Sequence, residues 1–125
     1  MKKFAKLLAV LPGIIFLISG LRWLTEPSAA AQMFGMTLLD GIGRSSQIGD
    51  MAAYFIAGSI MIFAGLITER RILLQVTAMI VAFTALFRIV AWLFHDAALA
   101  TSLIAPEIVF TLILLFAASR LPREQ

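Results

Sequence analysis

Hydrophobic residues run in four long stretches along the chain, at residues 4–24, 48–67, 72–94 and 99–119. Each stretch has about 20 residues, and a helix of that length is about 30 Å long, which matches the hydrocarbon core of a bilayer. Within these stretches polar and apolar residues do not alternate as they would in a β-strand. A backbone in lipid must satisfy its own hydrogen bonds, and a helix does so. The pattern therefore predicts an all-α, integral membrane four-helix bundle in a single domain, residues 1–125.

The first stretch has features of a secretory signal. A basic start precedes it, and the alanines at residues 29–31 imitate a cleavage site. However, the apolar run is long for a signal, and Arg22 and Glu26 would lie just before the cut. We therefore interpret it as a retained span.

The connection after the first stretch contains a second apolar segment, residues 28–39, which is uncharged and too short to span a bilayer. We predict that it forms a short interfacial or re-entrant helix with Ser28 as its N-cap. Residues 40–47 (DGIGRSSQ) are rich in turn-forming residues, so we expect Ser45 or Ser46 to cap the second span.

Pro106 leaves two layouts open for the fourth stretch. One is a single helix from about Leu99 that kinks at the proline; the other is a short surface helix at residues 97–104 and a span that begins near Pro106. The second layout leaves only about 21 Å of helix before Ser119, which is short for a crossing. We therefore favour the kinked helix.

Glycines recur seven residues apart in the first two spans, at Gly13 and Gly20 and at Gly58 and Gly65. Glycine is common in membrane helices, so this spacing alone is weak evidence. It also fits a stripe along which two helices approach closely, and we predict such packing.

Lysine and arginine predict the orientation, because cytoplasmic loops carry an excess of them. One side of the predicted bundle carries seven: Lys2, Lys3, Lys6, Arg70, Arg71, Arg120 and Arg123. The other side carries Arg22 and Arg44. We therefore expect both termini in the cytoplasm and a tight cytoplasmic hairpin at residues 68–71 (TERR).

Composition narrows the chemistry. Cysteine is absent, which excludes disulfides, thiolate metal sites and cysteine nucleophiles. The single histidine, His95, argues against a histidine-rich metal or haem site, and we interpret it as a solvated loop residue. The net charge of +3 is explained by basic helix ends, so we expect no nucleic-acid partner, and the sequence suggests no cofactor or catalytic motif.

Each span carries one ionisable residue near its outer end: Arg22, Asp50, Arg88 and Glu107. Arg88 and Glu107 lie about 9 and 12 Å inside their span ends, where a charge is costly. They lie at similar depths on consecutive helices, so we predict an Arg88–Glu107 ion pair. Arg22 and Asp50 are expected to form a second pair or to exchange partners with the first.

The residues nearer the span ends also have a purely structural explanation that needs no binding site. Arg22 and Asp50 complement helix dipoles or reach the interface, and Trp23 and Trp92 resemble ordinary interfacial anchors. The depth of the other two charges favours a polar pocket, and Tyr54 lies one turn below Asp50. The candidate ligand-binding residues are Arg22, Asp50, Tyr54, Arg88, Trp92 and Glu107, with apolar walls from Met33, Phe34 and Met36.

Several motifs resemble a known group of proteins. The chain has Gly-Leu-Arg-Trp-Leu at residues 20–24, a following Glu26-Pro27, and Arg-Ser-Ser-Gln-Ile-Gly-Asp at residues 44–50. Together with the four spans, these resemble small uncharacterised bacterial membrane proteins related to the DoxX-like superfamily. The resemblance implies a four-helix bundle in the bacterial inner membrane, and it implies little about activity, because fold does not fix function.

Three functions remain open at this point. We favour a non-enzymatic protein that binds a lipid-like or quinone-like small molecule in an outward-facing polar pocket, where Arg22 and Arg88 hold an anionic or carbonyl group. The alternative is an accessory or assembly subunit of a larger membrane complex. The third is an enzyme or proton-coupled transporter that uses Glu107. The expected partners are membrane lipid and either a larger membrane complex or a homo-oligomer.

Overall fold

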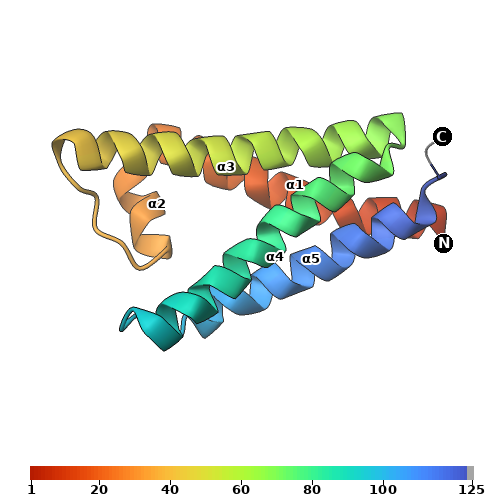
Figure 1. Ribbon diagram of the computed structural model, residues 1–125. Helices are drawn as coiled ribbons and strands as arrows, with labels where there is room; N and C mark the ends of the chain where they lie inside the picture. The colour runs from red at the N-terminus through yellow and green to blue at the C-terminus, as the bar shows by residue number, and fades with distance from the viewer. Residues whose placement is uncertain (124–125) are drawn as a thin grey trace.

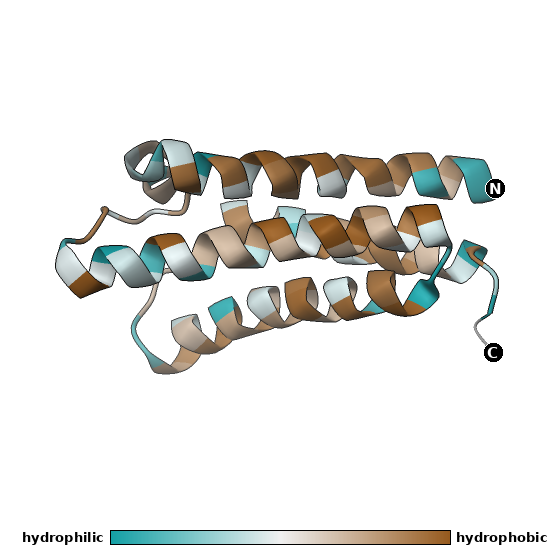
Figure 2. Cartoon of the chain, turned by 90° about the horizontal axis from the view of Figure 1, so that it is seen from above, coloured by the Kyte–Doolittle hydropathy of each residue, from teal (hydrophilic) through white to brown (hydrophobic). Residues whose placement is uncertain are grey.

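The computed structural model describes residues 1–123, which form five α-helices: α1 (Lys2–Thr25), α2 (Pro27–Met33), α3 (Gly41–Thr68), α4 (Arg71–Phe94) and α5 (Thr101–Arg120). None of the described residues forms a strand. The four helices other than α2 are long and apolar enough to cross a membrane. Hydrophobic residues dominate the middle of these helices and hydrophilic residues gather near their ends (Figure 2). The predicted all-α architecture is confirmed.

The long helices associate as two pairs (Figure 1). α1 packs against α3, and α4 packs against α5. The pairs lie close together at the end that carries both chain termini and diverge toward the other end, where α2 lies. We call the first the closed end, marked by Lys2, Glu69 and Leu121, and the second the open end, marked by α2 and residues 95–100.

Polar contacts fasten the closed end. Arg71, at the start of α4, donates from Nε and Nη2 to the carbonyl oxygen of Leu121 at 2.9 and 2.7 Å, and from Nη2 to that of Ser119 at 3.2 Å. These carbonyls belong to the end of α5, where a cation also complements the helix dipole. The start of α4 and the end of α5 are thereby held together.

Small residues let the four long helices meet in the closed half. Ala5, Ala9, Ala117 and Ala118 are buried there with larger aliphatic side chains such as Leu74. Because small side chains allow close backbone approach, packing of this kind suits helices that have lipid around them.

The predicted glycine stripe is confirmed at the α1–α3 contact. A Cβ atom on Gly20 would lie 2.5 Å from Ile56 Cγ1 and 3.2 Å from the Ile56 backbone nitrogen, and one on Gly13 would lie 2.9 Å from Phe63 Cζ. Gly58 behaves similarly, since a Cβ there would lie 2.7 Å from Phe16 Cδ2, whereas Gly65 faces α4, with Leu74 Cδ2 3.1 Å from its added Cβ. The helices approach more closely than side chains at these positions permit.

The predicted start of the second span is wrong. α3 begins at Gly41 rather than near residue 48, its N-cap is Asp40, and Ser45 and Ser46 lie inside the helix. Arg44 donates to the Leu39 carbonyl oxygen at 2.8 Å and to Asp40 Oδ1 at 3.2 Å. These contacts stabilise the extra first turns, and the absence of proline from residues 40–47 permits them.

The short helix α2 is also displaced from its predicted bounds. Its N-cap is Glu26, Pro27 is its first residue and Ser28 is not a cap. Proline suits the first position because the missing N–H has no helical partner there. The helix ends at Met33, and residues 34–40 continue as irregular chain.

The remaining boundaries agree with the sequence. α3 ends at Thr68 and α4 begins at Arg71, so the predicted tight hairpin is confirmed. α5 runs through Pro106 without interruption, which confirms a single helix rather than a surface helix followed by a span.

Candidate functional site

A cavity of about 560 Å³ lies between the diverging helix pairs in the open half. All four long helices line it, as do α2 and the irregular chain that follows α2. Small-molecule sites in proteins commonly have about 300–1,000 Å³ and mostly apolar walls with a few polar groups. The polar side chains that line this cavity are Ser19, Asp50, Tyr54, Thr84, Arg88 and Glu107.

The predicted ion pair between Arg88 and Glu107 is confirmed. Arg88 Nε donates to Glu107 Oε1 at 3.0 Å and to Oε2 at 3.1 Å, across the α4–α5 hairpin. The two side chains are mostly buried, with 23% and 14% of their surface exposed. Each side chain gives the other the partner that a charge away from water requires.

The Arg88–Glu107 contact uses only one of the three guanidinium nitrogens. Within residues 1–123, Nη1 and Nη2 of Arg88 have no hydrogen-bond partner. A guanidinium has five N–H donors, so the four on Nη1 and Nη2 have no acceptor among these residues, and Arg88 lines the cavity. Arg88 is therefore anchored by Glu107 and still able to bind.

Two hydroxyl groups join α3 to α4 at the cavity wall. The Tyr54 hydroxyl lies 3.1 Å from Thr84 Oγ1, and Thr84 donates its only hydroxyl hydrogen to the Ile80 carbonyl oxygen at 2.9 Å. Tyr54 must therefore donate to Thr84. The Tyr54 oxygen keeps a free lone pair, and Tyr54 lines the cavity.

Asp50 is the third charged residue at the cavity. It is exposed, and its carboxylate has no hydrogen bond or ion pair with any of residues 1–123. The predicted Arg22–Asp50 contact does not form in this structure. Asp50 lies one helical turn from Tyr54 on α3, so both side chains lie on the same face.

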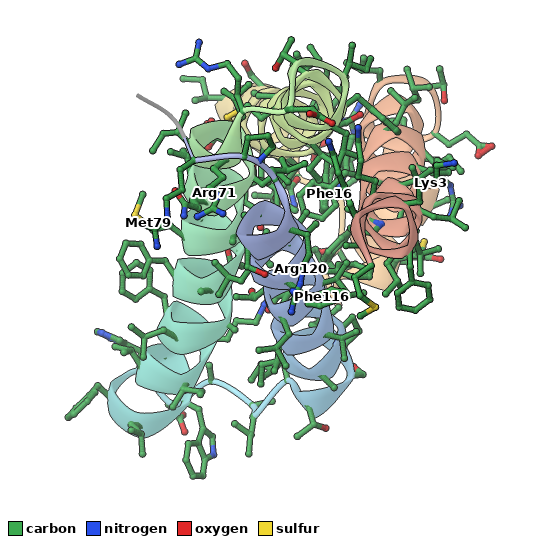
Figure 3. All side chains as sticks on the ribbon, turned by 90° about the vertical axis from the view of Figure 1, so that its right-hand side faces the viewer. Lys3, Phe16, Arg71, Met79, Phe116 and Arg120 are labelled. Carbon is green, nitrogen blue, oxygen red and sulfur yellow. The ribbon has the colours of Figure 1, made fainter. Side chains whose placement is uncertain are left out.

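Aromatic rings form much of the apolar wall. Phe16 packs edge-on against Phe55 with ring centroids 5.1 Å apart, and Tyr54 packs edge-on against Phe55 at 4.9 Å. Phe34 and Phe110 extend the group, with centroids 5.5 Å from Phe55 and 6.3 Å from Phe16 respectively. Phe16 lies between the helices in the interior of the bundle (Figure 3). Such edge-to-face pairs fix the ring positions and hence the cavity shape.

The segment from α2 to α3 covers part of the cavity, as expected from the sequence. Met33, Phe34 and Met36 all line it. Gln47 on α3 holds the irregular chain in place, since its Oε1 accepts from the Leu39 backbone N–H at 2.8 Å and its Nε2 donates to the Thr37 carbonyl oxygen at 3.1 Å.

Two of the predicted site residues do not reach this cavity. Arg22 lines a smaller adjoining pocket of about 170 Å³, where Nη1 donates to Met33 Sδ at 2.8 Å and Nε lies 3.8 Å from Glu26 Oε2. Glu26, which lies just past the end of α1, and the adjacent Met33 sulfur satisfy it locally. Trp92 is 45% exposed on α4 and lines neither space.

Other residues depart from the sequence interpretation or were missed. Trp23 is fully buried rather than interfacial, and its Nε1 has no hydrogen-bond partner in the described chain. His95 is exposed after the end of α4, as expected. Thr84 was missed, although it lies four residues before Arg88 and so shares its helix face.

The polar side chains that line the cavity offer hydrogen-bond donors and acceptors to a bound molecule. Within residues 1–123 no group of three or more histidine, aspartate or glutamate side chains is placed to hold a metal ion. The donors and acceptors around the cavity suit an organic molecule with polar groups and an apolar body. No protein-family model, curated protein or solved structure matches the chain.

Proposed function

We propose that this chain is a bacterial inner-membrane protein that binds a lipid-like or quinone-like amphipathic molecule in the cavity between its two helix pairs. In this arrangement the closed end is cytoplasmic, both termini are cytoplasmic, and α2 lies at the outer interface. The excess of lysine and arginine near the closed end supports the orientation. The resemblance to DoxX-like proteins at residues 20–24 and 44–50 supports the bacterial membrane.

One observation carries the binding proposal. Arg88 is held by Glu107 through Nε alone, its Nη groups have no partner within residues 1–123, and it lines a cavity whose walls are mostly aromatic and aliphatic. A charge kept deep in an apolar region is costly and marks a functional site more often than a structural one. A molecule with a hydrogen-bond acceptor and an apolar body would satisfy both parts of the cavity.

The test is mass spectrometry of the intact protein released from membranes in mild detergent. A tryptophan in place of Thr84 would project into the cavity and obstruct it, whereas a tryptophan in place of Met79 would lie on the outward face of the same helix (Figure 3). We expect one amphiphile per chain to remain with the wild type and with Met79→Trp, and to be lost from Thr84→Trp.

The result also separates the proposal from its alternative. Equal retention of mixed lipids by all three proteins would contradict specific binding in the cavity. Release of the chain in a stable larger assembly, with no bound amphiphile, would favour an accessory subunit instead.

A further inference from the structure

The charges that line the cavity do not cancel. Asp50, Arg88 and Glu107 are the charged residues at its walls. Arg88 and Glu107 neutralise each other in their ion pair, with Nε to oxygen distances of 3.0 and 3.1 Å. Asp50 has no ion-pair partner within residues 1–123, so the cavity carries one net negative charge.

Arg22 does not restore the balance. The sequence suggested that Arg22 and Arg88 together hold an anionic group, but Arg22 lies in the smaller pocket beside Glu26 and Met33. An anion in the larger cavity would meet one guanidinium, already paired, and two carboxylates. Like charges disfavour such binding.

The remaining walls favour a positive charge. Five aromatic rings, those of Phe16, Phe34, Tyr54, Phe55 and Phe110, line the same cavity as Asp50. Aromatic faces attract ammonium and related cations, most strongly where water is excluded. Tyr54 lies one turn from Asp50 on α3, and its hydroxyl reaches Thr84 on α4, the helix that also carries Arg88.

We propose that the ligand is a lipophilic cation, with its charge beside Asp50 and its apolar body against the aromatic rings. This inference rests on the cavity being the ligand site, as proposed above, and adds the sign of the ligand's charge. Asp50 supplies the counter-charge, and the Arg88–Glu107 pair keeps α4 and α5 in place around the apolar body.

Two probes of nearly equal shape and opposite charge test the sign directly: tetraphenylphosphonium and tetraphenylborate. Equilibrium binding of each would be measured to the purified protein in an uncharged maltoside detergent, with detergent alone as background. The whole chain has a formal charge of +3, which favours the anion everywhere except at a locally negative site. A preference for the cation would therefore originate at a locally negative site, and its loss in Asp50→Asn would place that site in the cavity.

We expect the phosphonium to bind the wild type at least about tenfold more tightly than the borate, a difference of about 1.4 kcal/mol. Asp50→Asn should remove that preference, and Asp50→Glu should keep it. Asp96→Asn is the matched control, because Asp96 is exposed at the same end, lies outside the cavity, and has a positive φ that asparagine tolerates.

The outcomes separate the two proposals. Equal or tighter binding of the borate, blocked by Thr84→Trp, would overturn the cationic ligand and leave the cavity as a binding site. A cation preference that survives Asp50→Asn would also overturn the inference. Binding of neither probe above background would contradict the cavity site itself. Circular dichroism and gel filtration of each variant establish that it is folded before it is compared.

Discussion

Arg88 and Glu107 face each other across the α4–α5 hairpin, with Arg88 Nε 3.0 Å from Glu107 Oε1 and 3.1 Å from Oε2. The pair joins two helices that diverge, as a pair, from α1 and α3 (Figure 1). It therefore holds one side of the cavity together at the depth where the helices have few other polar contacts.

Removing Arg88 should cost more stability than removing an exposed arginine. Arg88→Ala leaves Glu107 as an uncompensated charge, and we expect a loss of about 1–3 kcal/mol, below the ~3–5 kcal/mol of fully buried pairs because both side chains are partly exposed. Arg44→Ala should cost about 0.5 kcal/mol or less, since Arg44 is half exposed. Thermal unfolding in detergent measures both changes.

A double variant checks that the ion pair is the cause. Arg88→Ala combined with Glu107→Ala should be more stable than Arg88→Ala alone, because no charge is then left without a partner. Equal melting temperatures for Arg88→Ala and Arg44→Ala would show that the pair contributes little.

Gly20 should tolerate no side chain. A Cβ there would meet Ile56 Cγ1 at 2.5 Å and the Ile56 backbone nitrogen at 3.2 Å, and backbone does not yield easily. We expect Gly20→Ala to destabilise the bundle by about 1–3 kcal/mol. Gly49→Ala is the control, because no atom lies within 4 Å of its added Cβ, and alanine is the better helix former. Destabilisation by Gly49→Ala alone would contradict the packing described at α1–α3.

Acid should weaken the closed end. Hydrogen bonds from Lys2 and Lys6, at 2.8 and 3.0 Å, lower the pKa of Glu69 in the loop between α3 and α4. The unfolded chain therefore takes up this proton at a higher pH than the folded chain, so the stabilisation is complete above pH of about 4.3 and is lost as pH falls toward the lowered pKa. Unfolding measured between pH 6 and pH 3 should show this loss.

Two comparisons isolate the contribution of Glu69. Glu69→Gln should flatten the pH dependence below about pH 4.3, because the titrating carboxylate is gone. About 1 M salt should weaken the same dependence in the wild type, since the groups are at the surface. An unchanged slope in Glu69→Gln would assign the acid sensitivity to other carboxylates.

The sequence predicted the long-range features that follow from hydrophobicity and from the cost of charge. The four long helices, the hairpin before Arg71 and the Arg88–Glu107 pair all followed from those two rules. The start of α3 did not, because the residues before Gln47 have the composition of a turn, and contacts of Arg44 and Gln47 with the preceding chain stabilise the helix there.

The candidate site was predicted in part. Asp50, Tyr54, Arg88 and Glu107 line one cavity, but Arg22 and Trp92 lie outside it. The sequence indicated how far along its helix each residue lies. It did not indicate toward which neighbouring helix the side chain faces. Glu26 lies four residues after Arg22, at the end of α1, and that spacing was the signal that a local acid satisfies the Arg22 charge.

Methionine methyl groups allow the most direct test of binding in the cavity. The chain has six methionines, of which Met33, Met36 and Met51 line the cavity and Met1, Met61 and Met79 do not. With 13C-labelled methionine methyls in lipid nanodiscs, tetraphenylphosphonium or the co-purified amphiphile would be titrated while the NMR spectrum is followed. Saturable shifts of the first three methyls, with the other three unchanged, are the predicted result. Shifts of all six in proportion to ligand, or no saturable shift at Met33, Met36 and Met51, would contradict a binding site between the two helix pairs.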